Sequence, residues 1–139
     1  MRPLPQDEAR RWFEQAQQDL MDARYLAEGA RHNVACFLAQ QAAEKALKAF
    51  LYDRGAESVW GHSVEALCRE AADEDLDFAV EAVELAPLDQ YYIPTRYPNA
   101  LPGGIPSRAY VAEDARRAIG LAERALAVVA GKLGTPGSA

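Results

Sequence analysis

Long apolar runs and reactive side chains are scarce in this chain of 139 residues. No apolar stretch approaches the roughly 20 residues of a membrane span. The first residues also lack the apolar core of a signal peptide, so we expect a cytoplasmic protein. Cys36 and Cys68 are too few for a disulfide scaffold, and we expect both as reduced core residues. HxxxH, HExxH, CxxC and glycine-rich phosphate-loop spacings are all missing, so neither a metal site nor a cofactor is expected.

What the sequence has in abundance is alanine, at 28 of 139 positions against 9 glycines and 8 prolines. Alanine is the best helix former, and apolar residues recur at three- and four-residue steps. We therefore predict an all-α fold, an antiparallel up-and-down four-helix bundle with one additional short helix. One domain should span 1–133, followed by a disordered tail at 134–139. The helices are expected at about 6–28, 34–53 (capped by Asn33), 63–72, from 76 with a restart at Pro87, and 109–132.

The net charge of −6 is unevenly distributed along the chain. The segment from Glu65 to Asp89 holds nine acidic residues against a single base, Arg69. The segment from Tyr91 to Ala112 holds two arginines and no acid. Extended RNA binding by this chain alone is therefore disfavoured, but a local phosphate site is not excluded. The acidic segment is predicted to be a solvated or partner-facing surface.

The densest polar pattern lies in the second predicted helix, between Gln40 and Lys48. Gln41, Lys45 and Lys48 share one helical face, and Gln40, Glu44 and Lys48 share another. One interpretation is a Glu44–Lys48 ion pair on an exposed face, worth a few tenths of a kcal/mol. The other is a polar stripe that faces a cleft or a partner helix. The sequence leaves both open.

Two further candidates follow that helix. His62 begins the third predicted helix, where its ring either caps or packs locally, or serves a ligand or active site. Arg96 is surrounded by Tyr91, Tyr92 and Tyr97 in a proline-restricted loop. The tyrosines suit loop anchoring as well as base stacking, whereas Arg96 is expected to have a specific partner.

Taken together, these segments resemble the HEPN family (higher eukaryotes and prokaryotes nucleotide-binding). The resemblance spans about residues 8–132. Its most specific parts are QQAAEKALKA in the second helix and the Arg-Tyr-Pro loop at Arg96. The segments that carry it are 12–23, 36–49, 62–67, 92–99 and 114–115.

The resemblance implies a helical bundle that forms a homodimer and works with a minimal nucleotidyltransferase, as in toxin–antitoxin modules. Many members are ribonucleases that use an Arg, four to six residues, then a His. No arginine here has that spacing: the corresponding positions after Arg96 hold Leu101, Pro102 and Gly103, and seven residues separate Arg54 from His62.

Three hypotheses follow. The first is a non-catalytic HEPN module that binds a nucleotide and a nucleotidyltransferase partner. The second is a metal-independent ribonuclease toxin with an unusual site built from His62 and Arg96. The third is a purely structural dimerisation domain. The ligand-binding residues expected under the first hypothesis are Gln41, Lys45, Lys48, His62, Arg96 and Tyr97.

Overall fold

Helices account for all the regular structure in residues 3–134, the part of the chain that the computed structural model describes. This confirms the all-α expectation. None of these helices has the length and apolar character needed to cross a bilayer. The predicted tail lies outside the described residues, apart from Gly134. The elements are α1 (Pro5–Glu28), α2 (His32–Asp53), α3 (Val64–Ala72), α4 (Phe78–Leu85), α5 (Pro106–Ala109) and α6 (Ala112–Lys132), with 3-10 turns η1 (Ala86–Tyr91) and η2 (Pro98–Ala100).

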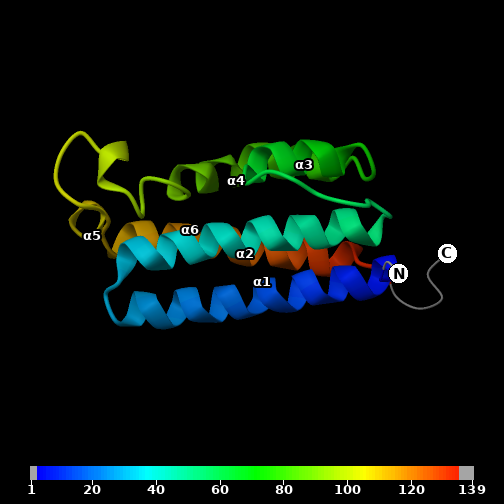
Figure 1. The fold of residues 1–139 in the computed structure, drawn as a ribbon, viewed down its shortest axis with the longest axis horizontal. Helices are drawn as coiled ribbons and strands as arrows, with labels where there is room; N and C mark the ends of the chain where they lie inside the picture. The colour runs from blue at the N-terminus through cyan, green and yellow to red at the C-terminus, as the bar shows by residue number, and fades with distance from the viewer. Residues whose placement is uncertain (1–2, 135–139) are drawn as a thin grey trace.

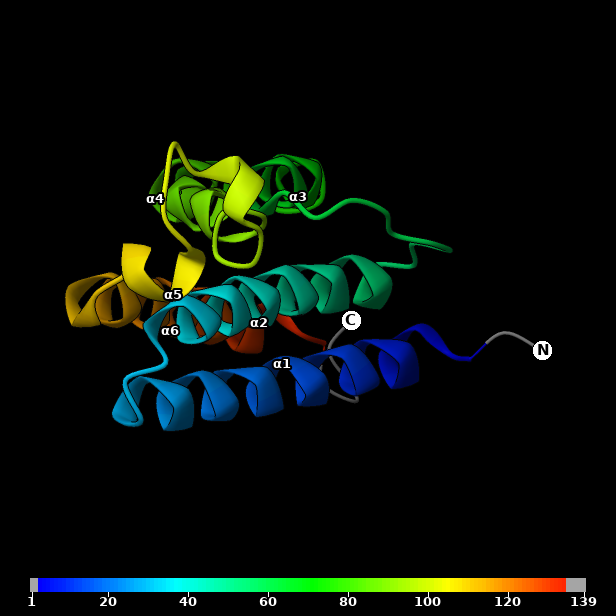
Figure 2. The ribbon, with the colours of Figure 1, turned by 60° about the vertical axis from the view of Figure 1, so that its left-hand side comes forward.

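The helices form successive layers with α2 in the middle of the bundle. Figures 1 and 2 both show α1 on one side of α2 and the pair α3 and α4 on the other, with α6 running beside α2. α1 and α2 are antiparallel and joined by a three-residue turn, 29–31. α2 contacts α1, α3 and α6. Its side chains therefore contribute both to the core and to the candidate site described below.

The core along α2 is built largely from alanine, whose small side chain lets helix axes approach closely. Six alanines of α2 are fully buried, and larger apolar groups fill the space at its end. The Phe50 and Phe78 rings, for instance, pack with centroids 4.5 Å apart and link α2 to α4. The buried alanines are Ala35, Ala39, Ala42, Ala43, Ala46 and Ala49.

Two expected helix boundaries were wrong. α2 begins at His32, and Asn33 does not cap it, because the Asn33 amide donates instead to the Thr95 carbonyl at 3.0 Å. The helix predicted at 109–132 does not run through Tyr110, because the backbone of Tyr110 is extended and separates α5 from α6. There the Asp114 carboxylate accepts from Val111 N at 2.8 Å and starts α6. The expected restart at Pro87 is confirmed, since α4 ends at Leu85 and η1 follows.

Both cysteines are buried and free, as expected. Burial raises the pKa of the Cys36 thiol, and likewise that of Cys68, to about 12. Nearby carboxylates add to the effect: Asp114 at Cys36, and Glu81 foremost at Cys68. The reactive thiolate is therefore almost absent at neutral pH, and the two thiols act as small apolar core groups.

Candidate functional site

A buried carboxylate, Glu44 on α2, gathers most of the polar side chains predicted from the sequence. Lys48 Nζ lies 3.1 Å from Glu44 Oε2, and the Gln41 amide donates to Glu44 Oε1 at 3.3 Å. The His62 ring reaches the same carboxylate from the α2–α3 loop, with Nδ1 3.2 Å from Oε1. Glu44 and Lys48 are both buried, with side chains 4% and 7% exposed. The Glu44–Lys48 pair therefore exists, but inside the bundle rather than on an exposed face.

The segment 62–64 is fixed from two directions. The Gln40 amide donates to the His62 carbonyl at 2.8 Å. On the other side, Ser63 caps α3, because its hydroxyl oxygen accepts from Ala66 N at 3.0 Å. Asp89 of η1 accepts from the Ser63 hydroxyl at 2.7 Å and from Val64 N at 2.6 Å. The cap that the sequence left open for His62 thus belongs to Ser63, and the imidazole is available for other contacts.

Tyr92 connects His62 to Arg96. The His62 and Tyr92 rings stack with centroids 4.6 Å apart, and the Arg96 guanidinium lies 4.8 Å from the Tyr92 ring. Arg96 Nε donates to the Tyr92 carbonyl at 2.9 Å. The guanidinium also lies over the Phe37 and Tyr97 rings, at 4.2 and 5.1 Å. We call Phe37, His62, Tyr92, Arg96 and Tyr97 the His62–Arg96 surface.

The loop that carries Arg96 is itself anchored to the bundle. The buried Thr95 hydroxyl donates to the Tyr91 carbonyl at 2.6 Å, and the Thr95 carbonyl accepts from Asn33 at the start of α2. Tyr91 is buried and packs edge-on against Tyr110. Tyr91 therefore fulfils the anchoring role, whereas Tyr92 serves the candidate site.

The contact with Glu44 determines which nitrogen of His62 is available. A carboxylate beside Nδ1 favours the tautomer in which Nδ1 carries the proton and donates it. The second ring nitrogen, Nε2, is then an acceptor. The His62 side chain is 55% exposed. The geometry therefore supplies a hydrogen-bond acceptor or base beside a cation and several aromatic faces.

The two predicted lysines already have carboxylate partners. Lys45 Nζ lies 2.6 Å from Asp19 on α1, and Asp19, which is buried, also accepts from Gln15 at 2.8 Å. Lys48 pairs with Glu44 and lies 5.6 Å from the centre of the Trp12 ring. The structure thus brings Gln41, Lys48, His62, Arg96 and Tyr97 into one chain of contacts, whereas Lys45 joins α1 to α2 beside them.

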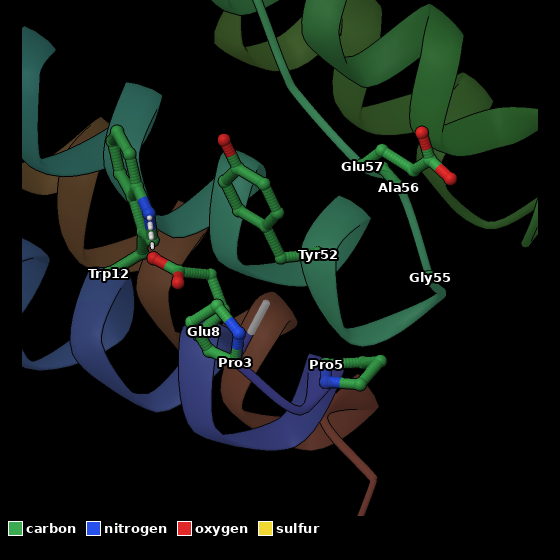
Figure 3. A pocket seen from close by; sticks show the side chains of 8 residues that line it. All are labelled: Pro3, Pro5, Glu8, Trp12, Tyr52, Gly55, Ala56 and Glu57. Carbon is green, nitrogen blue, oxygen red and sulfur yellow. Dashed lines mark hydrogen bonds between the residues drawn. The ribbon is translucent and has the colours of Figure 1, made fainter. Parts of the chain in front are cut away.

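Next to Lys48 lies a pocket of about 500 Å³ between the start of α1, the end of α2 and the following loop (Figure 3). Trp12 stacks on Tyr52 with ring centroids 5.5 Å apart, and its Nε1 donates to Glu8 at 3.0 Å. No side chain cluster in residues 3–134 could hold a metal ion. The pocket is lined by Pro3, Pro5, Glu8, Trp12, Tyr52, Gly55, Ala56 and Glu57.

Sequence reasoning missed Tyr92 and Asp89 as the residues that assemble this site. The sequence leaves Tyr92 open between loop anchoring and base stacking, and it places Asp89 only in the acidic segment. Their contacts reach across 30 and 26 residues of sequence, to His62 and Ser63. No local pattern encodes such pairings. The one weak signal for Tyr92 in the sequence was its place among three tyrosines close to Arg96.

Comparison with known proteins supports the resemblance seen in the sequence. The family model of the HEPN domain matches residues 9–132. TT1696 from Thermus thermophilus is 46% identical, with a TM-score of 0.83. ST0689, an archaeal HEPN homologue, is 37% identical, with a TM-score of 0.73. Each alignment covers 91% of this chain and 98% of the other. No curated protein matches the chain. The chain belongs to the HEPN family.

Proposed function

We propose that this HEPN domain is a binding module that holds a nucleotide on the His62–Arg96 surface. We further propose that it acts as a cytoplasmic homodimer together with a minimal nucleotidyltransferase. The dimer and the partner are supported by family membership. The nucleotide site is supported by one observation above all: His62 and Arg96, distant in sequence, both contact the ring of the same residue, Tyr92.

The chemistry of this surface suits a nucleotide. Arg96 uses Nε for the Tyr92 carbonyl, which leaves the two terminal NH₂ groups of the guanidinium for a phosphate. Tyr97 is half exposed and lies beside the guanidinium, where its ring offers a face for a base. His62 Nε2 accepts a hydrogen bond from a ribose hydroxyl or a base. Phosphate, sugar and base thus each have a complementary group on one surface.

The test is binding of a fluorescent ATP analogue to the purified full-length protein, with unlabelled ATP and pyrophosphate as competitors. Losing a charge-assisted hydrogen bond costs about 1.5–3 kcal/mol, so Arg96→Ala should weaken binding at least about tenfold. Arg108→Ala is the matched control, because Arg108 is an exposed arginine in the same acid-free segment. Equal affinity in wild type and Arg96→Ala would reject the site.

A specific observation favours a second function, RNA cleavage. The Glu44 carboxylate orients His62 in the manner that acid–histidine pairs use to hold a general base. In that chemistry His62 would take the proton of the ribose 2′-hydroxyl, while Arg96 would stabilise the pentavalent phosphorane. In the family's ribonucleases the arginine and the histidine are separated by four to six residues. Here His62 and Arg96 would act together because both contact Tyr92. It would make the chain a ribonuclease toxin.

The second function predicts metal-independent cleavage of a short single-stranded RNA in the presence of EDTA. His62→Ala should lower the rate by roughly 10²–10⁴-fold, the usual contribution of a general base. His32→Ala is the control, since His32 lies at the start of α2, whereas His62 lies in the α2–α3 loop. RNA left intact by the wild-type protein, together with ATP binding that depends on Arg96, would leave the binding module as the function.

A further inference from the structure

α4 is apolar on two opposite faces, although it lies at the surface of the bundle. One face packs into the core through Phe78, Ala82 and Leu85. The other face presents Leu76, Val80 and Val83 to solvent, and their exposed fractions are 79%, 58% and 67%. A surface helix of a monomeric domain normally carries polar residues on its outer side. The outer side of α4 is therefore unlike that of an ordinary solvated helix.

The exposed residues form one continuous stripe. Leu76 precedes the helix, but Asp77 has helical backbone angles and Ala79 N bonds to the Leu76 carbonyl at 3.0 Å. Leu76, Val80 and Val83 thus lie at i, i+4 and i+7 on one helical surface. The exposed Ala79 lies between them. Stripes of this spacing are how one helix contacts another in protein complexes.

Negative charge is concentrated in the segment that carries the stripe. The segment from Glu65 to Asp89 holds nine acids and one base. Two bases of α6 reach it: Arg124 contacts Glu81 and Glu84, and Lys132 contacts Asp75 and Asp77. Glu81 is buried, Asp89 is held by hydrogen bonds at the start of α3, and Arg54 of α2 also lies beside the segment. The seven remaining acids against four bases still leave a net negative charge. The remaining exposed acids, Glu70, Asp73 and Glu74, lie at the end of α3 and in the turn that leads to α4, where they line a pocket with the end of α2.

We propose that the outer face of α4, formed by Leu76, Ala79, Val80 and Val83, docks an amphipathic helix of a different protein whose polar flanks are basic. A second copy of this chain does not fit, because two such acidic faces would repel each other. Nucleic acid does not fit for the same reason. An apolar stripe on a segment with excess negative charge is complementary to a basic helix with an apolar stripe.

The probe is a labelled synthetic helical peptide with leucines at i, i+3, i+4 and i+7 and lysines elsewhere, titrated at 150 mM salt and followed by fluorescence anisotropy. Saturable one-to-one binding is expected. Val80→Ser combined with Val83→Ser should weaken it at least tenfold, and Glu84→Gln by a smaller factor. Val111→Ser is the control, because Val111 is equally exposed but precedes α6. A peptide with the same composition and scrambled spacing should not compete.

Failure of the wild-type protein to bind the peptide would overturn the proposal, and so would either of two other results. One is peptide binding that the double variant leaves unchanged, or that Val111→Ser weakens as much. The other is a wild-type oligomer that the double variant converts to a smaller species in sedimentation velocity, since a second copy would then cover the stripe. Both substitutions are at exposed positions, so folding is retained and circular dichroism can verify it. The His62–Arg96 surface lies elsewhere, so ATP binding is unaffected by either outcome.

Discussion

Glu44→Ala is expected to lower the free energy of unfolding by about 3–5 kcal/mol, because it leaves the buried Lys48 ammonium without its carboxylate. The same substitution removes the acceptor for His62 Nδ1 and for Gln41. Urea denaturation at one fixed protein concentration measures the loss. Almost all of it should come from the uncompensated charge rather than from the lost packing of Glu44.

A pair of further variants separates those two causes. Glu44→Leu combined with Lys48→Leu removes both charges, and it should recover most of the stability that Glu44→Ala loses. Glu65→Ala is the matched control, since Glu65 and Arg69 form an exposed i,i+4 pair at 3.7 Å, worth less than about 1 kcal/mol. If Glu44→Ala cost no more than Glu65→Ala, the description of Glu44 as a buried hub would be wrong.

Phe78→Ala is expected to cost about 3–5 kcal/mol in the same measurement. Phe78 and Phe50 are both fully buried and in ring contact, so truncating Phe78 opens a cavity where α4 meets α2. Phe78→Leu, which retains most of the volume, should cost less than half as much. Val83→Ala, on the exposed face of the same helix, should change stability by less than about 0.5 kcal/mol. Similar losses for Phe78→Ala and Val83→Ala would contradict the two-faced description of α4.

Much of the fold could be predicted because its helices are encoded locally. Apolar spacing marked α1 and α2 to within two residues at each end, and Pro87 marked the end of α4. The errors arose where distant residues compete for a local group. Asn33 has a good capping side chain, but it donates to Thr95, 62 residues away. Tyr110 fits the apolar pattern of the last helix, but its backbone is extended and the helix starts after it.

The sequence singled out part of the contact network around Glu44 and Tyr92, but not its geometry. Residue type and helical spacing singled out Gln41, Lys48, His62 and Arg96. The same spacing could not show that Lys48 is buried. Alanines flank Lys48 on a helix whether its side chain faces the core or the solvent, so the sequence pattern is the same in both cases. Nor could it show that Tyr92 lies between His62 and Arg96, since that depends on how the α2–α3 loop and the loop after η1 meet.

The hydrogen bonds of Asp89 have a mechanical consequence for any ligand that touches both His62 and Arg96. Asp89 ties η1 to the first turn of α3, so hydrogen bonds hold the segment leading into Tyr92 against the segment following His62. A ligand that bridges the two residues therefore meets a spacing that is set before it arrives. Binding then orders little of the chain and costs little conformational entropy. Such a site selects ligands by the distance between the groups that contact His62 and Arg96.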